Sequence, residues 1–227
     1  MCGRYVLSAE PQLVQQEFNL SNTPQLAARY NIAPSQPVAI ITNQVPDELM
    51  IVKWGLVPSW SKDPKIGYKM INSRSETAHE KPSFRAAFKR RRCLIPVSGF
   101  YEWTKTDDGK QPHYIHVKDS EVFSFAGLWE IWHSPDGDEM WTATILTTEA
   151  NEAIEHLHHR MPVILDGENR DIWLDGDSDV GELRLLMKPY AGDKMAHYPV
   201  SKAVNSVRND NPTLIERDDP PTQQSMF

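Results

Sequence analysis

The residue with the most distinctive chemistry is Cys2, because it directly follows the initiator methionine. Cysteine is small enough for Met1 to be removed, and the mature chain would then begin with an α-amine and a thiol on neighbouring carbons. Such a 1,2-aminothiol condenses with an aldehyde to an imine, and its sulfur closes on the imine to give a thiazolidine. An α-amine has an ordinary pKa of about 7.7–8.0, so it is partly neutral near pH 7. The thiol needs a cationic neighbour to ionise, and Arg4 is a candidate for that role.

Three further polar residues stand beside apolar or turn-forming ones, where functional sites are commonly found. Glu102, between two aromatic residues, is either a carboxyl group with a raised pKa or an outward-facing strand residue. His158 is either a general acid or base or a surface histidine. Asn72 either orients a substrate through its amide or caps a turn. Taken singly, none of these residues establishes a site, and Cys2 alone could simply be the residue after the start codon.

The cysteines and histidines exclude several classes of protein. Cys2 and Cys93 are the only cysteines, which excludes a disulfide scaffold and a Cys₄ zinc site and fits a reducing cytosol. His156, His158 and His159 lie within four residues, but no carboxylate or cysteine at matching spacing accompanies them, so we expect no metal and no cofactor. Without an apolar N-terminal region or a run of 18 apolar residues, we expect no signal peptide and no membrane span. The sequence therefore predicts a cytoplasmic protein.

The charge is distributed unevenly along the chain. The 227 residues carry a net charge of −7, yet residues 1–120 carry +5 and residues 121–227 carry −12. This asymmetry permits a basic face on an acidic protein. The densest basic run, residues 89–92, is either a phosphate contact or a solvated helix end. If the protein binds DNA, the binding is expected to be modest and sensitive to salt.

Short apolar and β-branched runs separated by short helices predict a single α+β domain built mainly on antiparallel sheet. The sequence does not fix the order of the strands. The expected helices cover residues 9–19, 80–91, 149–156 and 180–187. The expected strands cover residues 38–42 and 50–54 around a turn at Pro46-Asp47, then 93–97, a hairpin of 113–117 with 122–128, and 140–147. The polar tail from Arg217 is expected to be disordered.

Six motifs occur in an order that is informative as a set. They are Met-Cys-Gly-Arg at 1–4, Trp-Gly-Leu-Val-Pro-Ser-Trp at 54–60, Asn-Ser-Arg-Ser-Glu-Thr at 72–77, Arg-Arg-Cys-Leu-Ile-Pro-Val-Ser-Gly-Phe-Tyr-Glu-Trp at 91–103, His-His-Arg-Met-Pro-Val-Ile-Leu at 158–165 and Pro-Val-Ser-Lys-Ala-Val-Asn at 199–205. This combination closely resembles the SOS response-associated peptidase (SRAP) family of abasic-site processing proteins. The resemblance implies one domain over residues 1–216 with a barrel-like sheet and flanking short helices, followed by a disordered tail over 217–227.

The resemblance also implies an activity. Its members capture the ring-opened aldehyde of an abasic site in single-stranded DNA as a thiazolidine DNA–protein crosslink, which protects the lesion during the DNA damage response. On matching positions Cys2 is the nucleophile, Asn72 holds the Cys2 backbone or the opened sugar, Glu102 moves protons at the Cys2 amine, and His158 acts during ring opening. Strand cleavage by β-elimination and reversal of the crosslink through Glu102 are implied side activities.

The resemblance implies DNA contacts at five positions, and single-strand binding calls for cationic groups for phosphates and flat rings for bases. For the two tryptophans the alternative is core packing. The partner would be single-stranded DNA, with no membrane and no metal, and the protein would act as a monomer. The candidate residues are Arg4, Trp54, Trp60, Arg74 and Arg160.

Two other functions remain open on the residue types. Cys2, His158 and either Asn72 or Glu102 fit the nucleophile, base and orienting group of a thiol peptidase. The aromatic and arginine residues would alternatively suffice for a non-covalent reader of modified bases. An extra residue before Cys2 would abolish thiazolidine chemistry but spare a peptidase, whereas a reader would form nothing covalent.

Overall fold

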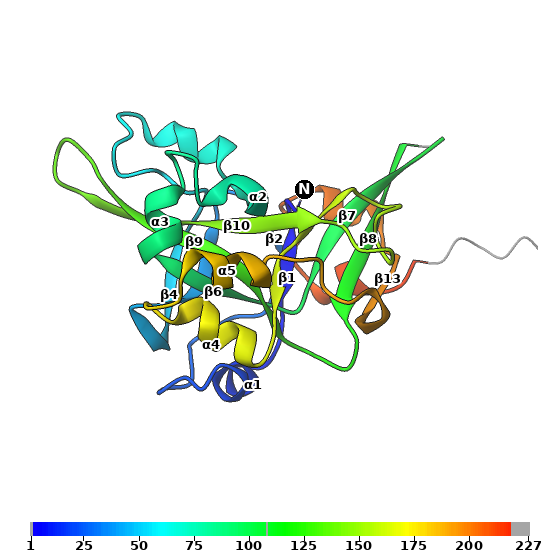
Figure 1. The fold of residues 1–227 in the computed structure, drawn as a ribbon. Coiled ribbons are helices and arrows are strands. Elements are labelled where there is room, and N and C mark those ends of the chain that lie inside the picture. The colour runs from blue at the N-terminus through cyan, green and yellow to red at the C-terminus, as the bar shows by residue number, and fades with distance from the viewer. Residues whose placement is uncertain (1, 108, 219–227) are drawn as a thin grey trace, which may run out of the picture.

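The computed structural model describes residues 2–107 and 109–218, which form two β-sheets with short helices around them (Figure 1). The first sheet has five strands in the order β13-β8-β7-β1-β2, and every neighbouring pair is antiparallel. Its longest members, β7 and β8, form a hairpin that extends from the body of the molecule. The bounds are β1 Tyr5–Leu7, β2 Arg29–Ile32, β7 Gly99–Thr106, β8 Gly109–Val117 and β13 Met195–Pro199.

The second sheet closes into a five-stranded barrel, because β10 pairs with β9 on one side and with β4 on the other. The ring runs β10-β4-β3-β6-β9, and three short strands extend it at β10 and β9. The pairings of β10 with β4 and with β5 are parallel, and all others in this sheet are antiparallel. The bounds are β3 Pro37–Thr42, β4 Val45–Trp54, β5 Asn72–Arg74, β6 Arg92–Val97, β9 Phe123–His133, β10 Glu139–Glu149, β11 Arg160–Pro162 and β12 Ile164–Leu165.

The barrel strands carry the main hydrophobic core. Every residue of β6 is buried, and β9 and β10 are buried over most of their length. Apolar side chains fill the interior of a small barrel, as expected for this strand number. The helices are all seven residues or shorter. They are α1 Pro11–Glu17, α2 Ser75–Ala78, α3 Arg85–Arg90, α4 Glu168–Leu174 and α5 Val180–Leu186, with 3₁₀ turns η1 Pro64–Lys69, η2 Gly192–Lys194, η3 Lys202–Asn205 and η4 Pro212–Ile215.

The predicted α+β domain with a mainly antiparallel, barrel-like sheet and short flanking helices is confirmed. Among the elements, α1, α5 and the strands expected at 38–42, 50–54, 93–97 and 140–147 are present. The start of α5 follows from its sequence, since Asp179 and Glu182 form a reciprocal capping box there.

Four local expectations were wrong. The β3–β4 turn lies at residues 43–44, and Pro46 instead sits in an irregular stretch of β4, where its missing N–H costs no ladder bond. The expected hairpin is absent because β8 pairs with β7 and β13, while β9 belongs to the barrel. Residues 152–157 form turns rather than a helix, and the helix expected from residue 80 begins only at Arg85.

Ordered structure extends slightly beyond the predicted domain. Arg217 forms an isolated bridge with Val200, and its guanidinium lies 5.2 Å from the centre of the Tyr198 ring, so the tail does not begin at 217. The remainder of the predicted tail, residues 219–227, lies outside the described residues, as does Met1. Within residues 2–107 and 109–218, no helix is both long and apolar enough to cross a membrane.

Candidate active site

The four predicted catalytic residues lie on or next to four strands, two from each sheet. Cys2 leads into β1, which pairs with β7, the strand that carries Glu102. Asn72 begins β5, which pairs with β10, and His158 precedes β11, which pairs with the same strand. The Asn72 amide joins the two halves, because its Nδ2 donates a 2.8 Å hydrogen bond to the Cys2 carbonyl oxygen. In Figure 1 the N-terminal end of the chain accordingly lies beside α2 and β10.

The Cys2 thiol is buried and protonated. Burial raises its pKa well above the ordinary value, and the negative charge of Glu102 adds to that effect. Its only hydrogen-bond contact among the described residues is a weak one, 3.8 Å from Sγ to the backbone carbonyl of Arg4. The expectation that the Arg4 side chain activates the thiol is wrong, because that guanidinium is bound elsewhere.

Arg4 ties the N-terminus to the C-terminal segment. Its Nη1 donates to Asn31 Oδ1 and to the Val204 carbonyl, each at 2.8 Å, and Nη2 lies 3.5 Å from the Asn205 carbonyl. In this structure the guanidinium therefore stabilises the position of the C-terminal segment.

Glu102 is a buried carboxyl group whose pKa is raised. The residue is only 4% exposed, and burial raises the pKa of its carboxyl group. On the neighbouring strand β8 it stands directly opposite His113. A carboxylic acid of this kind can donate a proton to a developing oxyanion and take one back as carboxylate.

His158 is held in its neutral form by its surroundings, because burial lowers the pKa of its imidazole. Its Nδ1 lies 2.9 Å from the Arg160 backbone nitrogen and 3.2 Å from the Arg160 carbonyl oxygen, which fixes the orientation of the ring. Burial lowers the pKa of His158, and His159, whose ring stacks on it at 4.4 Å, adds to that shift. The neutral ring can therefore donate or accept a proton near neutral pH.

Only one of the two polar atoms of the Asn72 amide makes a hydrogen bond among the described residues. While Nδ2 bonds to Cys2, the buried Oδ1 has no hydrogen-bond partner among the described residues. A buried amide oxygen without a partner costs free energy unless a ligand or water supplies a donor. Asn72 can therefore hold the Cys2 backbone and still accept a hydrogen bond from a bound group.

Arg160 forms a bidentate ion pair with Glu76, a residue that was not predicted from the sequence. Nη1 and Nη2 lie 2.5 and 2.9 Å from the two Glu76 oxygens, and Nη2 also donates to the Thr147 carbonyl. The Arg160 side chain is only 10% exposed. Arg160 thus joins α2 to β10.

The two predicted stacking tryptophans have opposite environments. Trp54 is 1% exposed, packs edge-on against Tyr5 and donates from Nε1 to the Ile71 carbonyl at 2.8 Å, so it belongs to the core and its predicted stacking role is wrong. Trp60 is 59% exposed, and its Nε1 lies 3.4 Å from the Pro82 carbonyl. A second exposed ring that the sequence reasoning missed is Tyr68 on η1.

Arg74 is exposed and lines an open pocket of about 630 Å³ beside the site. The pocket combines cationic and imidazole groups with two carboxylates, and its lining residues are Arg74, Glu149, Ala150, Glu155, His156, His159 and Arg160. Within the described ranges, no group of three or more His, Cys, Asp or Glu side chains is arranged to hold a metal ion.

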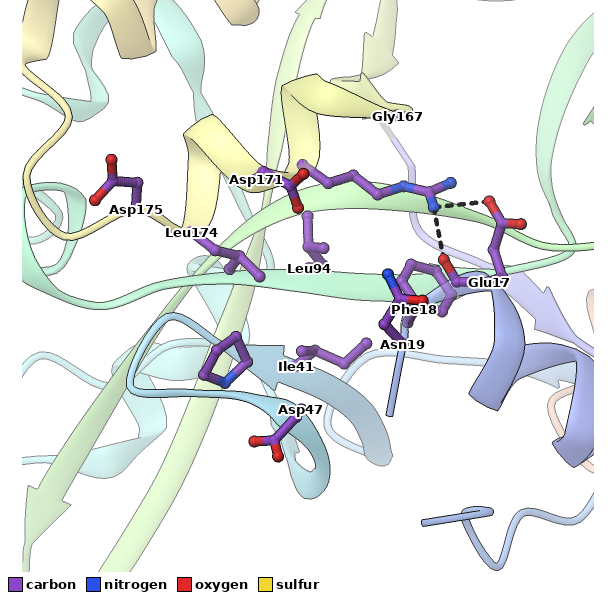
Figure 2. Close-up of a pocket in the computed structure, with 12 residues that line it drawn as sticks. Glu17, Phe18, Asn19, Ile41, Asp47, Leu94, Gly167, Asp171, Leu174 and Asp175 are labelled. Atoms are coloured by element: carbon purple, nitrogen blue, oxygen red, sulfur yellow. Dashed lines mark hydrogen bonds and ion pairs between the residues drawn. The ribbon is translucent and has the colours of Figure 1, made fainter. Parts of the chain in front are cut away.

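A second pocket, of about 530 Å³, lies apart from these residues between α1, α4 and the β3–β4 region (Figure 2). Apolar side chains form its wall, and Asp47, Asp171 and Asp175 surround it. Arg170 is bound to Glu17 at 2.7 Å and so offers no free cation there. This pocket would repel phosphate groups, and none of the four predicted catalytic residues lines it.

A closed barrel packed beside a second sheet, with the N-terminal cysteine segment at their junction, defines the class of fold. The same fold occurs in a solved structure of a protein from Bacteroides thetaiotaomicron, with a TM-score of 0.86 and 30% identity over 96% of this chain and 100% of that one.

The chain belongs to the SOS response associated peptidase (SRAP) family, whose family profile matches residues 1–207. The abasic site processing protein YoqW of Bacillus subtilis (strain 168) is 46% identical to it over 222 residues, which cover 95% of this chain and 99% of YoqW. The abasic site processing protein HMCES of Gallus gallus is 37% identical over 82% of this chain and 65% of its own length. The predicted family is confirmed, and its named relatives process abasic sites.

Proposed function

We propose that this protein captures abasic sites in single-stranded DNA as a thiazolidine crosslink to Cys2, after Met1 has been removed. The observation that carries the proposal is the Asn72–Cys2 hydrogen bond, which fixes the backbone of the second residue next to Glu102 rather than leaving it to fray. A terminal segment is normally mobile unless it is tied down. The printed names of YoqW and HMCES support abasic sites as the substrate.

The chemistry follows from the protonation states of the site. The neutral His158 imidazole exchanges a proton with a sugar oxygen as the abasic ring opens to its aldehyde. The Cys2 amine then adds to C1′, and Glu102, whose raised pKa favours its acid form, protonates the resulting hydroxyl so that water leaves and an imine forms. The thiol sulfur adds to the imine carbon, and its proton passes through the Glu102 carboxylate to the nitrogen. One aldehyde and one aminothiol thus give one thiazolidine and one water.

The buried thiol favours this order of steps over peptidase chemistry. A peptidase nucleophile is a thiolate beside an imidazolium, which requires a lowered cysteine pKa. Here burial raises the pKa of Cys2 and lowers that of His158, so both groups are neutral. A neutral thiol suffices for addition to an imine that the amine has already formed. Strand cleavage by β-elimination is a side reaction of the same imine.

Trp60 and Arg74 are the proposed DNA contacts. Trp60 presents an exposed ring on which a base can stack, and Arg74 is an exposed cation that makes no ion pair among the described residues. Such a pairing of flat rings with cations binds single strands without reading their sequence. A non-covalent reader would use the same groups but would not need Cys2.

The test is an intact mass measurement after incubation with abasic single-stranded DNA. The wild type should lack Met1 and gain the mass of the DNA minus one water as a heat-stable adduct. Cys2→Ala should give an adduct only when borohydride traps its imine. Cys93→Ala, which removes the other buried free cysteine, is the matched control and should crosslink normally.

Glu102→Gln should slow adduct formation by about 10²- to 10⁴-fold, the usual contribution of a positioned acid or base. If Cys2→Ala forms as much heat-stable adduct as the wild type without reductant, the thiazolidine assignment is wrong. If an extra residue before Cys2 leaves a covalent activity intact, the peptidase alternative gains support instead.

A further inference from the structure

The basic run at residues 89–92 divides into two arginines that have protein partners, Arg91 and Arg92, and two exposed cations. Arg92 is buried, and its Nε donates to the Trp173 carbonyl at 2.7 Å. Arg91 forms an ion pair with Glu130 at 2.6 Å. Lys89 and Arg90 are exposed at the end of α3. Only the second pair is therefore available to a partner.

Arg92 also fixes the end of α3. Its Nη1 donates to the carbonyls of Phe88 and Lys89 at 3.0 and 2.9 Å, which are among the carbonyls that a helix end leaves open. Phe88, on the inner side of the helix, is buried against Trp173 with ring centres 5.8 Å apart. The exposed side chains of α3 therefore project from a rigidly held helix.

Four exposed cations, which we call the α3 cation row, follow this helix and the turn before it. The turn is continuous with the helix, because Arg85 N–H donates to the Lys81 carbonyl at 2.8 Å. A spacing of four residues gives a rise of about 6 Å per step, so three of the cations lie on one side over about 12 Å. None of the four makes an ion pair or a side-chain hydrogen bond within residues 2–107 and 109–218. The row consists of Lys81, Arg85, Lys89 and Arg90.

The helix itself does not account for the row. Cations are favoured at a helix C-terminus, which explains Lys89 and Arg90, but they are disfavoured at its N-terminus, where Lys81 and Arg85 stand. Residues 79–92 contain a single acidic residue, Glu80, in a chain whose net charge is −7. Four cations without an ion pair among the described residues, three of them on one side, favour an anionic partner.

The row begins beside the proposed DNA contacts. Trp60 Nε1 lies 3.4 Å from the carbonyl of Pro82, the residue after Lys81. Arg74 immediately precedes α2, which leads through residues 79–84 into α3. In Figure 1, α2 lies beside the N-terminus and α3 lies farther out in the same direction.

We propose that the α3 cation row binds the phosphates of the DNA strand that leaves the abasic site past Trp60. The inference rests on the proposed function and adds to it a second phosphate-binding surface outside the reactive site. Each phosphate contact on a single strand contributes about 0.7 to the slope of log affinity against log salt. Reversing Lys89 and Arg90 should therefore lower that slope by about 1.4 and weaken binding roughly tenfold or more at low salt.

The experiment compares Lys89→Glu/Arg90→Glu with a control of equal charge change, Lys105→Glu/Lys110→Glu. The control lysines are exposed and pair across the tip of the β7–β8 hairpin, on the other side of the N-terminus from α3 (Figure 1). Both are built on Cys2→Ala, so that no covalent trap disturbs the binding equilibrium. Fluorescence anisotropy measures the affinity for single-stranded oligonucleotides of about 8 and about 30 nucleotides, carrying a central abasic site, at several salt concentrations.

The α3 variant should lose affinity for the long oligonucleotide and bind the short one as the parent does, while the control keeps both affinities. Equal losses in the two variants, or a loss that does not depend on length, would overturn the proposal. With Cys2 restored, the α3 variant should crosslink the short oligonucleotide at the wild-type rate. If the wild type itself forms no crosslink, the proposed function fails, while the anisotropy result still decides whether the row binds DNA.

Discussion

Replacing Asn72 by alanine should slow crosslinking without unfolding the protein. The substitution removes the 2.8 Å hydrogen bond to the Cys2 carbonyl, which then has no partner in a buried position. Leaving such a group unsatisfied costs about 1–3 kcal/mol. Residues 2–4 precede the first strand and can detach locally. The free-energy loss therefore lowers the fraction of molecules in which Cys2 is held in the reactive geometry. At 1.36 kcal/mol per tenfold, the rate should fall by roughly 5- to 150-fold.

The assay is single-turnover crosslinking at saturating abasic single-stranded DNA, so that binding does not limit the rate. Ser73→Ala is the control, because Ser73 follows on the same strand, is buried, and has a hydroxyl without a hydrogen-bond partner among the described residues. Its rate should match the wild type. Asn72→Asp should be slower than Asn72→Ala at neutral pH, since a carboxylate cannot donate to the carbonyl, and should recover as the pH falls and the acid gains a proton. Asn72→Ala rates within twofold of the wild type would refute the reasoning.

Two other predictions separate structural from functional side chains. Trp60→Ala should leave the melting temperature unchanged and weaken single-strand binding by about 1–3 kcal/mol, the usual value for one stacked base. Trp54→Ala should instead lower the free energy of unfolding by about 3–5 kcal/mol. DNA-binding titrations and thermal melts distinguish the two outcomes. Burial and the neighbouring His197 and His156 lower the pKa of His113 to about 4. The folded state therefore disfavours its proton, so this contribution to stability is full above about pH 6.5 and is lost as the pH falls toward 4. After a discount for partial exposure, the loss is about 1–2 kcal/mol, and denaturant titrations of His113→Gln should show a flatter pH dependence than the wild type.

The positions of the strands could be predicted from the sequence better than their pairing in the sheets. The apolar run at 93–97 becomes the fully buried β6, and β-branched residues mark β3. Closure of the barrel depends on β10, which reaches back to β4 in a parallel pairing that no local pattern announces. The expected hairpin failed for a related reason. Residues 118–122 contain turn signals, including Asp119 at φ 56°, yet this turn passes from one sheet to the other instead of reversing within one.

For the site, residue type and motif order suggested which side chains belong together but not which partners they already have. Arg160 and Arg4 are both cations near the reactive segment, and no sequence pattern distinguishes them from Arg74. Their partners lie 84 and 200 positions away, at Glu76 and Val204. Whether a cation is free for a phosphate is decided by such distant pairings, so only the structure leaves Arg74 as the available one.

The protonation states of the site share a single physical cause. Burial at the junction of the two sheets raises the pKa values of Cys2 and Glu102 and lowers that of His158, so each group is pushed toward its neutral form. The unliganded site therefore disfavours a thiolate nucleophile and favours neutral groups that can exchange protons with a carbonyl compound. Condensation of an amine with an aldehyde needs a neutral amine and an acid that can release water, in that order. The same burial that weakens the case for a thiolate peptidase therefore supplies the conditions that an aldehyde-capturing aminothiol requires.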